Sequence, residues 1–298
     1  MENNKKTAMK LIFMFGIISL LGDVIYEGAR SVNGQYLKIL GTNAILVGLI
    51  AGIGEFLGYA IRIVSGYFAD KTKSYWIFVI LGYGTLMVVP ILSFTEVWQY
   101  AAILIVAERI GKGVRSPSKD TILSQASKQV GTGVGFAIAE VLDQIGAAAG
   151  PLVFTIVFMY AGTSVKSVAD YQKGYAIYWL PFALLMLTII IARYMVKDPE
   201  KLELATISKK EPDNLTTVFW SYCWFSLISA SGFVSFVLIG YHLKAKNLLS
   251  DSYIPLSYIF IMIVDAIAAL FIGWMYDKMK KKKNDNKAGL LMLLFMPL

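Results

Sequence analysis

The 298-residue sequence is poor in the residues that support redox and metal chemistry. It contains one cysteine, Cys223, and one histidine, His242, so the chain can form neither an internal disulfide nor a multi-histidine metal site. We interpret both residues as structural. A Gly-rich loop of the G-x-x-x-x-G-K-S/T kind is also missing, which argues against direct ATP hydrolysis. No cofactor is expected, and an enzyme is the least favoured class because no nucleophile–base pair stands out.

Charged residues are scarce as well. They make up 16% of the chain, against 57% hydrophobic residues and a mean hydropathy of +0.61, whereas a soluble domain has about a quarter charged residues. This excludes a disordered chain, a coiled coil and a typical cytosolic protein. The net charge of +8 is no sign of a nucleic-acid partner, because the lysines lie between apolar runs, where positive charge sets membrane orientation. The partner implied by this pattern is the lipid bilayer.

Several apolar runs reach the roughly 20 residues that cross a hydrocarbon core. They predict an all-α membrane protein, a polytopic helical bundle. The first run contains Asp23 and Glu27 and has no convincing cleavage site, so it is expected to remain as a span and not to act as a signal peptide. The predicted spans are 9–31, 43–68, 76–95, 99–120, 131–160, 174–195, 216–243 and 252–276, and a ninth begins near Ala288.

The loop lysines predict the orientation and the domains. A cytoplasmic N-terminus puts most of them inside, whereas only Lys38, Lys166, Lys173, Lys244 and Lys246 fall outside. The longest polar cytoplasmic segment divides the spans into two groups. We therefore expect a six-helix bundle over 1–196, a linker over 197–215 and an incomplete bundle over 216–298 in the plasma membrane.

An internal repeat supports this division. Gly66-Tyr-Phe-Ala-Asp70-Lys71 ends the second span, and Gly273-Trp-Met-Tyr-Asp277-Lys278 ends the eighth, 207 residues later. Two parallel six-helix repeats are implied, and because a complete pair needs roughly twice this period, the chain is expected to be truncated in its second repeat. The Asp-Lys turns are predicted to act as a conformational latch, formed by Gly66, Asp70, Lys71, Gly273, Asp277 and Lys278.

These motifs resemble the major facilitator superfamily of secondary transporters. Gly66, Ala69, Asp70 and Lys71 match its loop signature G-x-L-A-D-R/K, with Lys73 where the family usually has a second glycine. Arg109-Ile-Gly-Lys-Gly113 resembles the family's R-x-x-x-G element, whose arginine is associated with substrate or proton coupling. The resemblance extends to a bacterial and archaeal subgroup of drug or sugar efflux permeases.

A third motif lies in the fifth span. Gly146-Ala-Ala-Ala-Gly150-Pro151 is similar to the G-x-x-x-G-P core of the signature found in proton-coupled antiporters. Small residues at this spacing allow close helix packing in a membrane. We assign a packing role to Gly146, Gly150 and Pro151, and the resemblance implies export.

Charged residues inside the spans are the candidate functional residues. Each costs at least ~2.5–3.5 kcal/mol near the bilayer centre, so such residues usually face a cavity or a partner. Asp23, Glu27 and Arg30 share one face of the first helix. Glu27, Arg30 and Arg115 are expected to act as interface anchors or structural ion pairs. The predicted coupling and cavity residues are Asp23, Glu55, Arg109, Lys112, Glu140, Asp143 and Asp265.

The sequence therefore predicts a secondary active transporter that moves a small molecule by alternating access, with proton-coupled efflux as the main reading. Glu55 or Asp143 is the expected proton carrier. One alternative is uptake or exchange of an anionic metabolite bound by Arg109, Lys112 and Arg115. Another is a membrane scaffold or sensor without transport. The resembled family implies a monomer.

Overall fold

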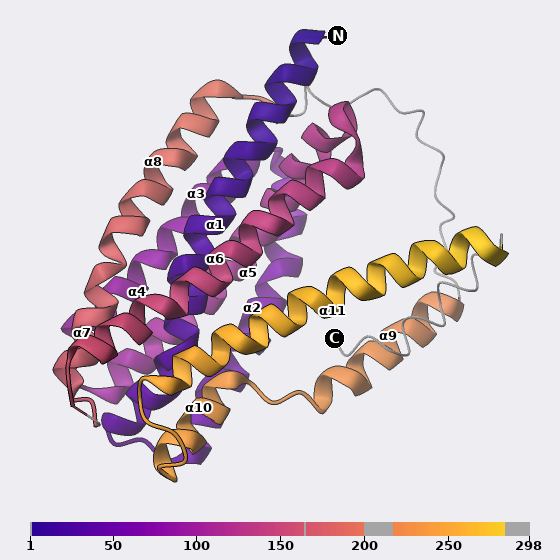
Figure 1. Ribbon diagram of the computed structural model, residues 1–298. Helices are drawn as coiled ribbons and strands as arrows, with labels where there is room; N and C mark the ends of the chain where they lie inside the picture. The colour runs from indigo at the N-terminus through magenta and orange to yellow at the C-terminus, as the bar shows by residue number, and fades with distance from the viewer. Residues whose placement is uncertain (1, 164, 200–216, 284–298) are drawn as a thin grey trace. The chain divides into compact units, whose positions relative to one another are not determined.

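The computed structural model describes residues 2–163, 165–199 and 217–283 (Figure 1). All regular structure in these residues is helical. The elements are α1 (Glu2–Ile39), α2 (Ala44–Thr72), α3 (Tyr75–Gly84), η1 (Thr85–Met87), α4 (Val88–Ile91), η2 (Leu92–Phe94), α5 (Trp98–Val130), α6 (Thr132–Tyr160), α7 (Val168–Ile177), α8 (Trp179–Met195), α9 (Thr217–Ser231), α10 (Phe236–Ala245) and α11 (Tyr253–Lys283).

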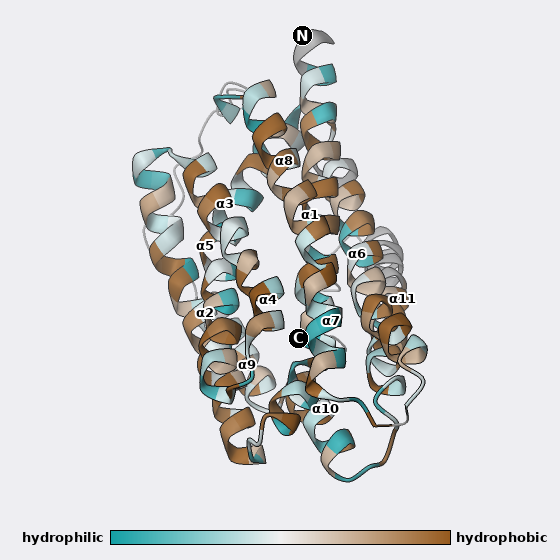
Figure 2. Ribbon diagram, turned by 90° about the vertical axis from the view of Figure 1, so that its left-hand side faces the viewer, coloured by the Kyte–Doolittle hydropathy of each residue, from teal (hydrophilic) through white to brown (hydrophobic). Residues whose placement is uncertain are grey.

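The predicted all-α membrane fold is confirmed. Within the described residues, six helical segments are long and apolar enough to cross a membrane, and hydrophobic residues cover much of α2 and α8 (Figure 2). The helix α5 is not among them, because Glu108, Arg109, Lys112 and Arg115 interrupt its apolar sequence. Its charges must therefore be covered by other helices.

The sixth and seventh predicted spans contain non-helical residues, and the third passes through two short 3-10 segments, η1 and η2. The sixth consists of α7 and α8, which meet at Tyr178. The seventh is interrupted over 232–235, between α9 and α10. The second break follows a run of small and polar residues that includes Gly232, and glycine weakens a helix interior.

The helices form two compact units. Unit one comprises Met1–Leu204 and Phe236–Phe260, and unit two comprises Ala205–Ser235 and Ile261–Leu298. In unit one, α1 packs against α5, α6, α8 and α10, and most of its residues from Ile25 to Leu37 are buried. The position of α1 at the centre of the unit determines where its polar side chains lie.

The helix pattern of the first repeat returns in the second. When α2 (Ala44–Thr72) is shifted by the 207-residue period it covers 251–279, and α11 runs over Tyr253–Lys283. The same shift moves α1 onto the broken pair α9 and α10. The repeat predicted from the Asp-Lys turns therefore appears in the helix boundaries, with one helix interrupted in the second copy.

The turn after α2 forms the described half of the predicted latch. Lys73 ends the helix with φ of 56°, the left-handed conformation that glycine adopts most readily. The exposed Asp70 accepts a hydrogen bond from the Tyr75 hydroxyl at 3.2 Å, which joins the end of α2 to the start of α3. In the other half, Gly273, Asp277 and Lys278 fall in α11, but their side chains lie outside the described residues, so the latch stays a prediction.

Glycines in α6 allow it to lie against the backbone of α1. A Cβ atom at Gly146 would come within 2.4 Å of the Leu20 carbonyl oxygen, and one at Gly150 within 2.4 Å of the Val24 carbonyl oxygen. Neither carbonyl can move without bending α1. The G-x-x-x-G spacing therefore holds the two helices in close contact.

We expect Gly150→Ala to destabilise the protein by about 1–3 kcal/mol, the usual cost of overpacking, measured as a lower melting temperature in detergent. Gly52→Ala is the matched control, because a Cβ there meets nothing within 4 Å. Equal melting temperatures for the two variants would show that α1 and α6 do not approach as closely as described.

Candidate functional site

Polar side chains of α1 lie in the middle of unit one. Ser19, Tyr26 and Glu27 are buried at 2%, 2% and 9% exposure, and Asp23 and Arg30 are half-buried. The spacing of three to four residues places them along one side of the helix. Because α1 is surrounded by other membrane helices, this side faces protein and not lipid.

The first group of charges surrounds Arg109 of α5. This guanidinium is 6% exposed and contacts three neighbours. Its Nη1 donates to the Tyr26 hydroxyl and lies 3.3 Å from Oε1 of Glu55, and its Nε lies 3.4 Å from Oε2 of Glu108. Arg30 approaches the same Glu55 oxygen at 3.6 Å. One carboxylate of α2 thus joins arginines of α1 and α5.

The ring of Tyr26 is a shared surface for cations. Lys112 Nζ lies 4.0 Å from its centroid, Arg109 Cζ 4.6 Å and Arg30 Cζ 5.9 Å. Such contacts stabilise a cation by about 2 kcal/mol when it is desolvated. The Lys112 ammonium forms no ion pair or hydrogen bond with the residues that the structure describes, and it lies over the aromatic face instead.

The first turns of α11, which belong to unit one, reach the same place. The Tyr258 hydroxyl donates to Oε2 of Glu27 at 2.5 Å, and the other oxygen of Glu27 lies 4.0 Å from Nη1 of Arg30. The second repeat therefore touches the charged network of the first. We call this network the Arg109 cluster: Tyr26, Glu27, Arg30, Glu55, Glu108, Arg109, Lys112 and Tyr258.

A second group, the Lys119 cluster, lies towards the N-terminal end of α1 and comprises Ser19, Asp23, Lys119 and Asp143. Lys119 Nζ donates to Ser19 Oγ at 2.9 Å and lies 3.7 Å from Oδ1 of Asp143. Asp23, one turn after Ser19, interacts electrostatically with both Asp143 and Lys119, but no hydrogen bond or ion pair reaches it from the described side chains. Lys119 therefore pairs with Asp143, and Asp23 lies nearby as a second acid.

Arg115 is not the interface anchor that its position predicts. It is 4% exposed, and its Cζ lies 4.8 Å from the centroid of the Tyr83 ring. Its Nη1 is buried with no hydrogen-bond partner. The charge stays inside because Gly82 lets α5 approach the α3 backbone, where a Cβ would meet Arg115 at 2.5 Å. Glu27, expected as an interface anchor or a structural ion pair, is buried in the Arg109 cluster, where it lies 4.0 Å from Arg30.

Of the predicted residues, Asp23 and Asp143 lie in the Lys119 cluster, and Glu55, Arg109 and Lys112 lie in the Arg109 cluster. The structure leaves two predicted residues apart. Glu140 is exposed and accepts a hydrogen bond from Gln144 at 3.1 Å, and Asp265 is exposed within unit two. Sequence reasoning did not select Tyr258 or Lys119, although the i, i+4 spacing of Ser19 and Asp23 marked the face that Lys119 contacts.

A third polar group lies at the end of unit one opposite the N-terminus of α1. Asp251, 2% exposed, accepts from the backbone N–H of Lys166 at 2.8 Å and from the Lys244 ammonium. Nearby, the Tyr241 hydroxyl donates to the Thr42 carbonyl at 3.3 Å. These bonds connect α10 and the loop before α11 to the ends of first-repeat helices.

The family model of the Major Facilitator Superfamily matches residues 11–297. The chain belongs to this superfamily. Its members' two-repeat architecture accounts for the 207-residue period and for the equivalence of α2 and α11, and membership favours a transporter over an enzyme.

Relatives and solved structures agree with this assignment. An uncharacterized protein of Mycobacterium tuberculosis is 37% identical over 278 residues, which cover 91% of this chain and 66% of that protein. An uncharacterized MFS-type transporter of Methanocaldococcus jannaschii is 29% identical over 168 residues, which cover 56% of this chain and 42% of that one. The chain thus spans slightly less than two thirds of the mycobacterial protein.

Among solved structures, a bacterial homologue of the human lysosomal transporter Spinster, in an inward-facing and occupied conformation, superposes with a TM-score of 0.68. It shares 15% sequence identity, and the match covers 91% of this chain and 61% of that one. At this identity the likeness shows the superfamily fold.

The Arg109 cluster predicts strong energetic coupling between its members. Arg109→Gln should lower the free energy of unfolding by about 3 kcal/mol, because it leaves Glu55 and Glu108 with fewer counter-charges. We place the value at the low end of the range for buried pairs because the Glu55 side chain is 37% exposed. The double variant Arg109→Gln/Glu55→Gln should regain part of this loss in detergent unfolding experiments.

The control for that cycle is Arg62→Gln, since the Arg62 guanidinium lies over the exposed Tyr59 ring. It should cost less than about 1 kcal/mol. Strictly additive effects of Arg109→Gln and Glu55→Gln would contradict the described contact.

Proposed function

We propose that the protein is a secondary active transporter that moves a small solute by alternating access. The observation behind this is the placement of ionised side chains from α1, α2, α5 and α6 inside a membrane helix bundle, where each is costly unless it serves a pathway or a partner. Membership of the Major Facilitator Superfamily supports the same conclusion.

We further propose that a proton is exchanged at the Lys119 cluster. Asp143 is the carrier, and Asp23 acts with it. Two neighbouring acids and one lysine accommodate an extra proton at low cost, because the like charges of the acids oppose each other. Glu55, the other candidate, lies between Arg30 and Arg109 and is better placed as a permanent counter-ion.

The contacts between the repeats supply a candidate gate. A Cβ at Gly34 of α1 would lie 1.9 Å from the Val237 carbonyl oxygen of α10, so the two helices touch closely at the end opposite the N-terminus. Asp251 and Tyr241 add polar bonds at this end. We propose that these contacts close the extracytoplasmic side and separate when the transporter opens outward.

Export is the direction that we propose. Its support is the segment Gly146–Pro151, whose spacing resembles the antiporter signature, and its close fit to α1 places that segment beside Asp143. An exporter of this kind takes up a proton from outside as the solute leaves.

Asp143→Asn should abolish proton-coupled transport and leave passive exchange, because an amide occupies the same volume without binding an exchangeable proton. The assay uses proteoliposomes with an internal pH dye and an imposed pH gradient, with ethidium as a lipophilic-cation probe and a neutral sugar as a second probe. Wild type should release protons when a transported solute is added, and Asp143→Asn should exchange that solute without proton release.

Glu96→Gln is the control, because this exposed acid lies in the loop before α5 and outside both clusters. Persistent uphill transport by Asp143→Asn would exclude Asp143 as carrier and return the role to Glu55. Absence of flux for every solute, together with intact folding, would favour a scaffold or sensor.

Anion transport is the second candidate function. It is favoured by Arg115 and Lys112, which form no ion pair with a described carboxylate, although both lie inside the bundle. Competition of phosphorylated and carboxylated solutes in the same proteoliposome assay separates the two. Inhibition by sugar phosphates that disappears in Arg115→Gln would replace the export proposal by exchange of an anionic metabolite.

A further inference from the structure

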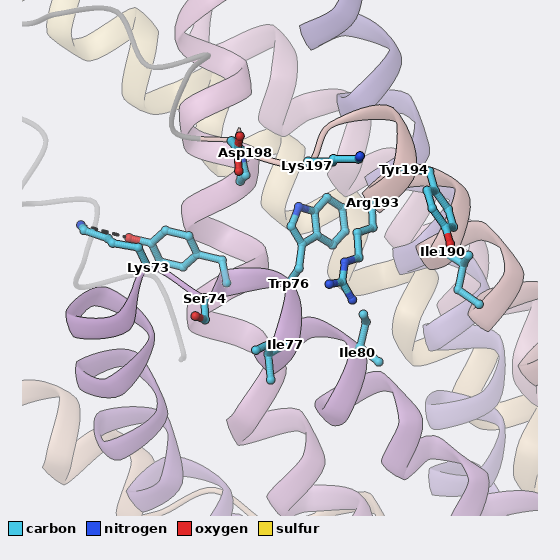
Figure 3. A pocket seen from close by; sticks show the side chains of 12 residues that line it. Lys73, Ser74, Trp76, Ile77, Ile80, Ile190, Arg193, Tyr194, Lys197 and Asp198 are labelled. Atoms are coloured by element: carbon cyan, nitrogen blue, oxygen red, sulfur yellow. Dashed lines mark hydrogen bonds between the residues drawn. The ribbon is translucent and has the colours of Figure 1, made fainter.

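A cavity of about 840 Å³ lies between the start of α3 and the end of α8 (Figure 3), and its lining residues belong to neither charged cluster. Trp76, Ile77 and Ile80 come from α3, and Arg193 comes from α8, followed by Lys197 in the segment after it. The volume is within the range of small-molecule sites, about 300–1,000 Å³. All its lining residues belong to unit one.

Cations dominate the polar part of the lining. The lining contains three basic residues, Lys73, Arg193 and Lys197, and one carboxylate, Asp198. Arg193 and Lys197 are exposed and form no ion pair with any described residue, whereas the Lys73 ammonium lies 3.4 Å from the Tyr75 hydroxyl. The cavity therefore has a surplus of positive charge and two cations that are available to a ligand.

The other part of the lining is apolar and open to the membrane. Ile77 is 50% exposed and Ile190 is 44% exposed, at helix positions that would contact lipid chains. Ile77 lies four residues after Lys73, which ends α2, and Ile190 lies three residues before Arg193 in α8. A ligand that fits both parts has an anionic head and a hydrocarbon tail.

The shape of the cavity is fixed by a bond between the two helices. The Trp76 indole N–H donates to the Val196 carbonyl at 2.9 Å, and the indole is 5% exposed. Trp76 thus joins α3 to the end of α8.

We propose that this cavity binds the headgroup of an anionic phospholipid, with its acyl chains along Ile77 and Ile190. Basic pockets between membrane helices on the cytoplasmic side recognise such headgroups, and the loop lysines predict that side for this end of α3. The head phosphate pairs with Arg193, which can bind it in a bidentate manner, and Lys197 adds a second charge. The proposal does not depend on which solute the protein transports.

The test is a thermal-stability titration of the full chain in a neutral detergent with dioctanoyl phosphatidylglycerol. The lipid should raise the melting temperature in a saturable manner, whereas dioctanoyl phosphatidylcholine should not. Since each basic residue contributes about fivefold to the affinity for anionic lipid, Arg193→Gln/Lys197→Gln should raise the half-saturating concentration roughly twenty-fold. Phosphatidylglycerol retained per molecule after purification should fall in the same variant.

Lys5→Gln/Lys10→Gln is the control, because it removes the same charge from exposed positions at the N-terminal end of α1. An equal loss of affinity in both double variants would overturn the proposal in favour of diffuse attraction to anionic lipid. A melting-temperature increase that inorganic phosphate reproduces would overturn it in favour of a free-anion site. If the cavity variant is too unstable to titrate, unchanged phosphatidylglycerol retention in Arg193→Lys and in Lys197→Gln would likewise contradict it.

Discussion

The cost of an ionised side chain in hydrocarbon is the constraint on which this structure depends. The chain places acids and bases at the middle of several helices, and each would cost ~2.5–3.5 kcal/mol or more in contact with lipid. Those helices must therefore bury their charges against one another. The structure satisfies this requirement with α1 as a central helix, whose polar side meets Glu55 of α2, Arg109 and Lys119 of α5, and Asp143 of α6.

Close packing around α1 follows from the same constraint. Short charge-to-charge distances require backbones that approach closely, and α6 achieves this with Gly146 and Gly150 against Leu20 and Val24. At the other end, tyrosines of α7 reach the amides of α1: the Tyr175 hydroxyl donates to Asn33 at 2.7 Å. The polar side of α1 is thus satisfied over several turns by side chains from different helices.

The sequence was sufficient for the fold and for much of the site. Hydropathy predicts the spans, and the 207-residue period predicts the repeat that the helix boundaries display. Periodicity also places Asp23, Glu27 and Arg30 on one side of α1. It could not predict which residues of other helices meet them. Glu140 and Asp143 are three residues apart and were assigned together, yet one is exposed and the other pairs with Lys119. About 60° of helix rotation separates the exposed position from the one beside α1.

The site residues and contacts that the sequence did not predict have a common physical origin, because they join residues far apart in the chain. Tyr258 meets Glu27 only after the second repeat folds against the first, and no local pattern marks a tyrosine for that role. The sequence position of Arg115 predicts that it reaches the membrane surface, but Gly82 allows α3 to pack closely against it. Local spacing determines the side of a helix on which a residue lies, whereas its environment depends on the neighbouring helix.

The two repeats share helix positions, but they differ in the polar residues that they carry at equivalent positions, 207 residues apart. Shifted by 207 residues, Asp23 and Glu27 fall on Ala230 and Val234, at the end of α9 and within the break before α10. A helix end leaves backbone carbonyls without intrahelical partners, and interrupted membrane helices can offer such groups to a ligand. Where the first repeat presents ionised side chains, the second therefore presents an interrupted backbone.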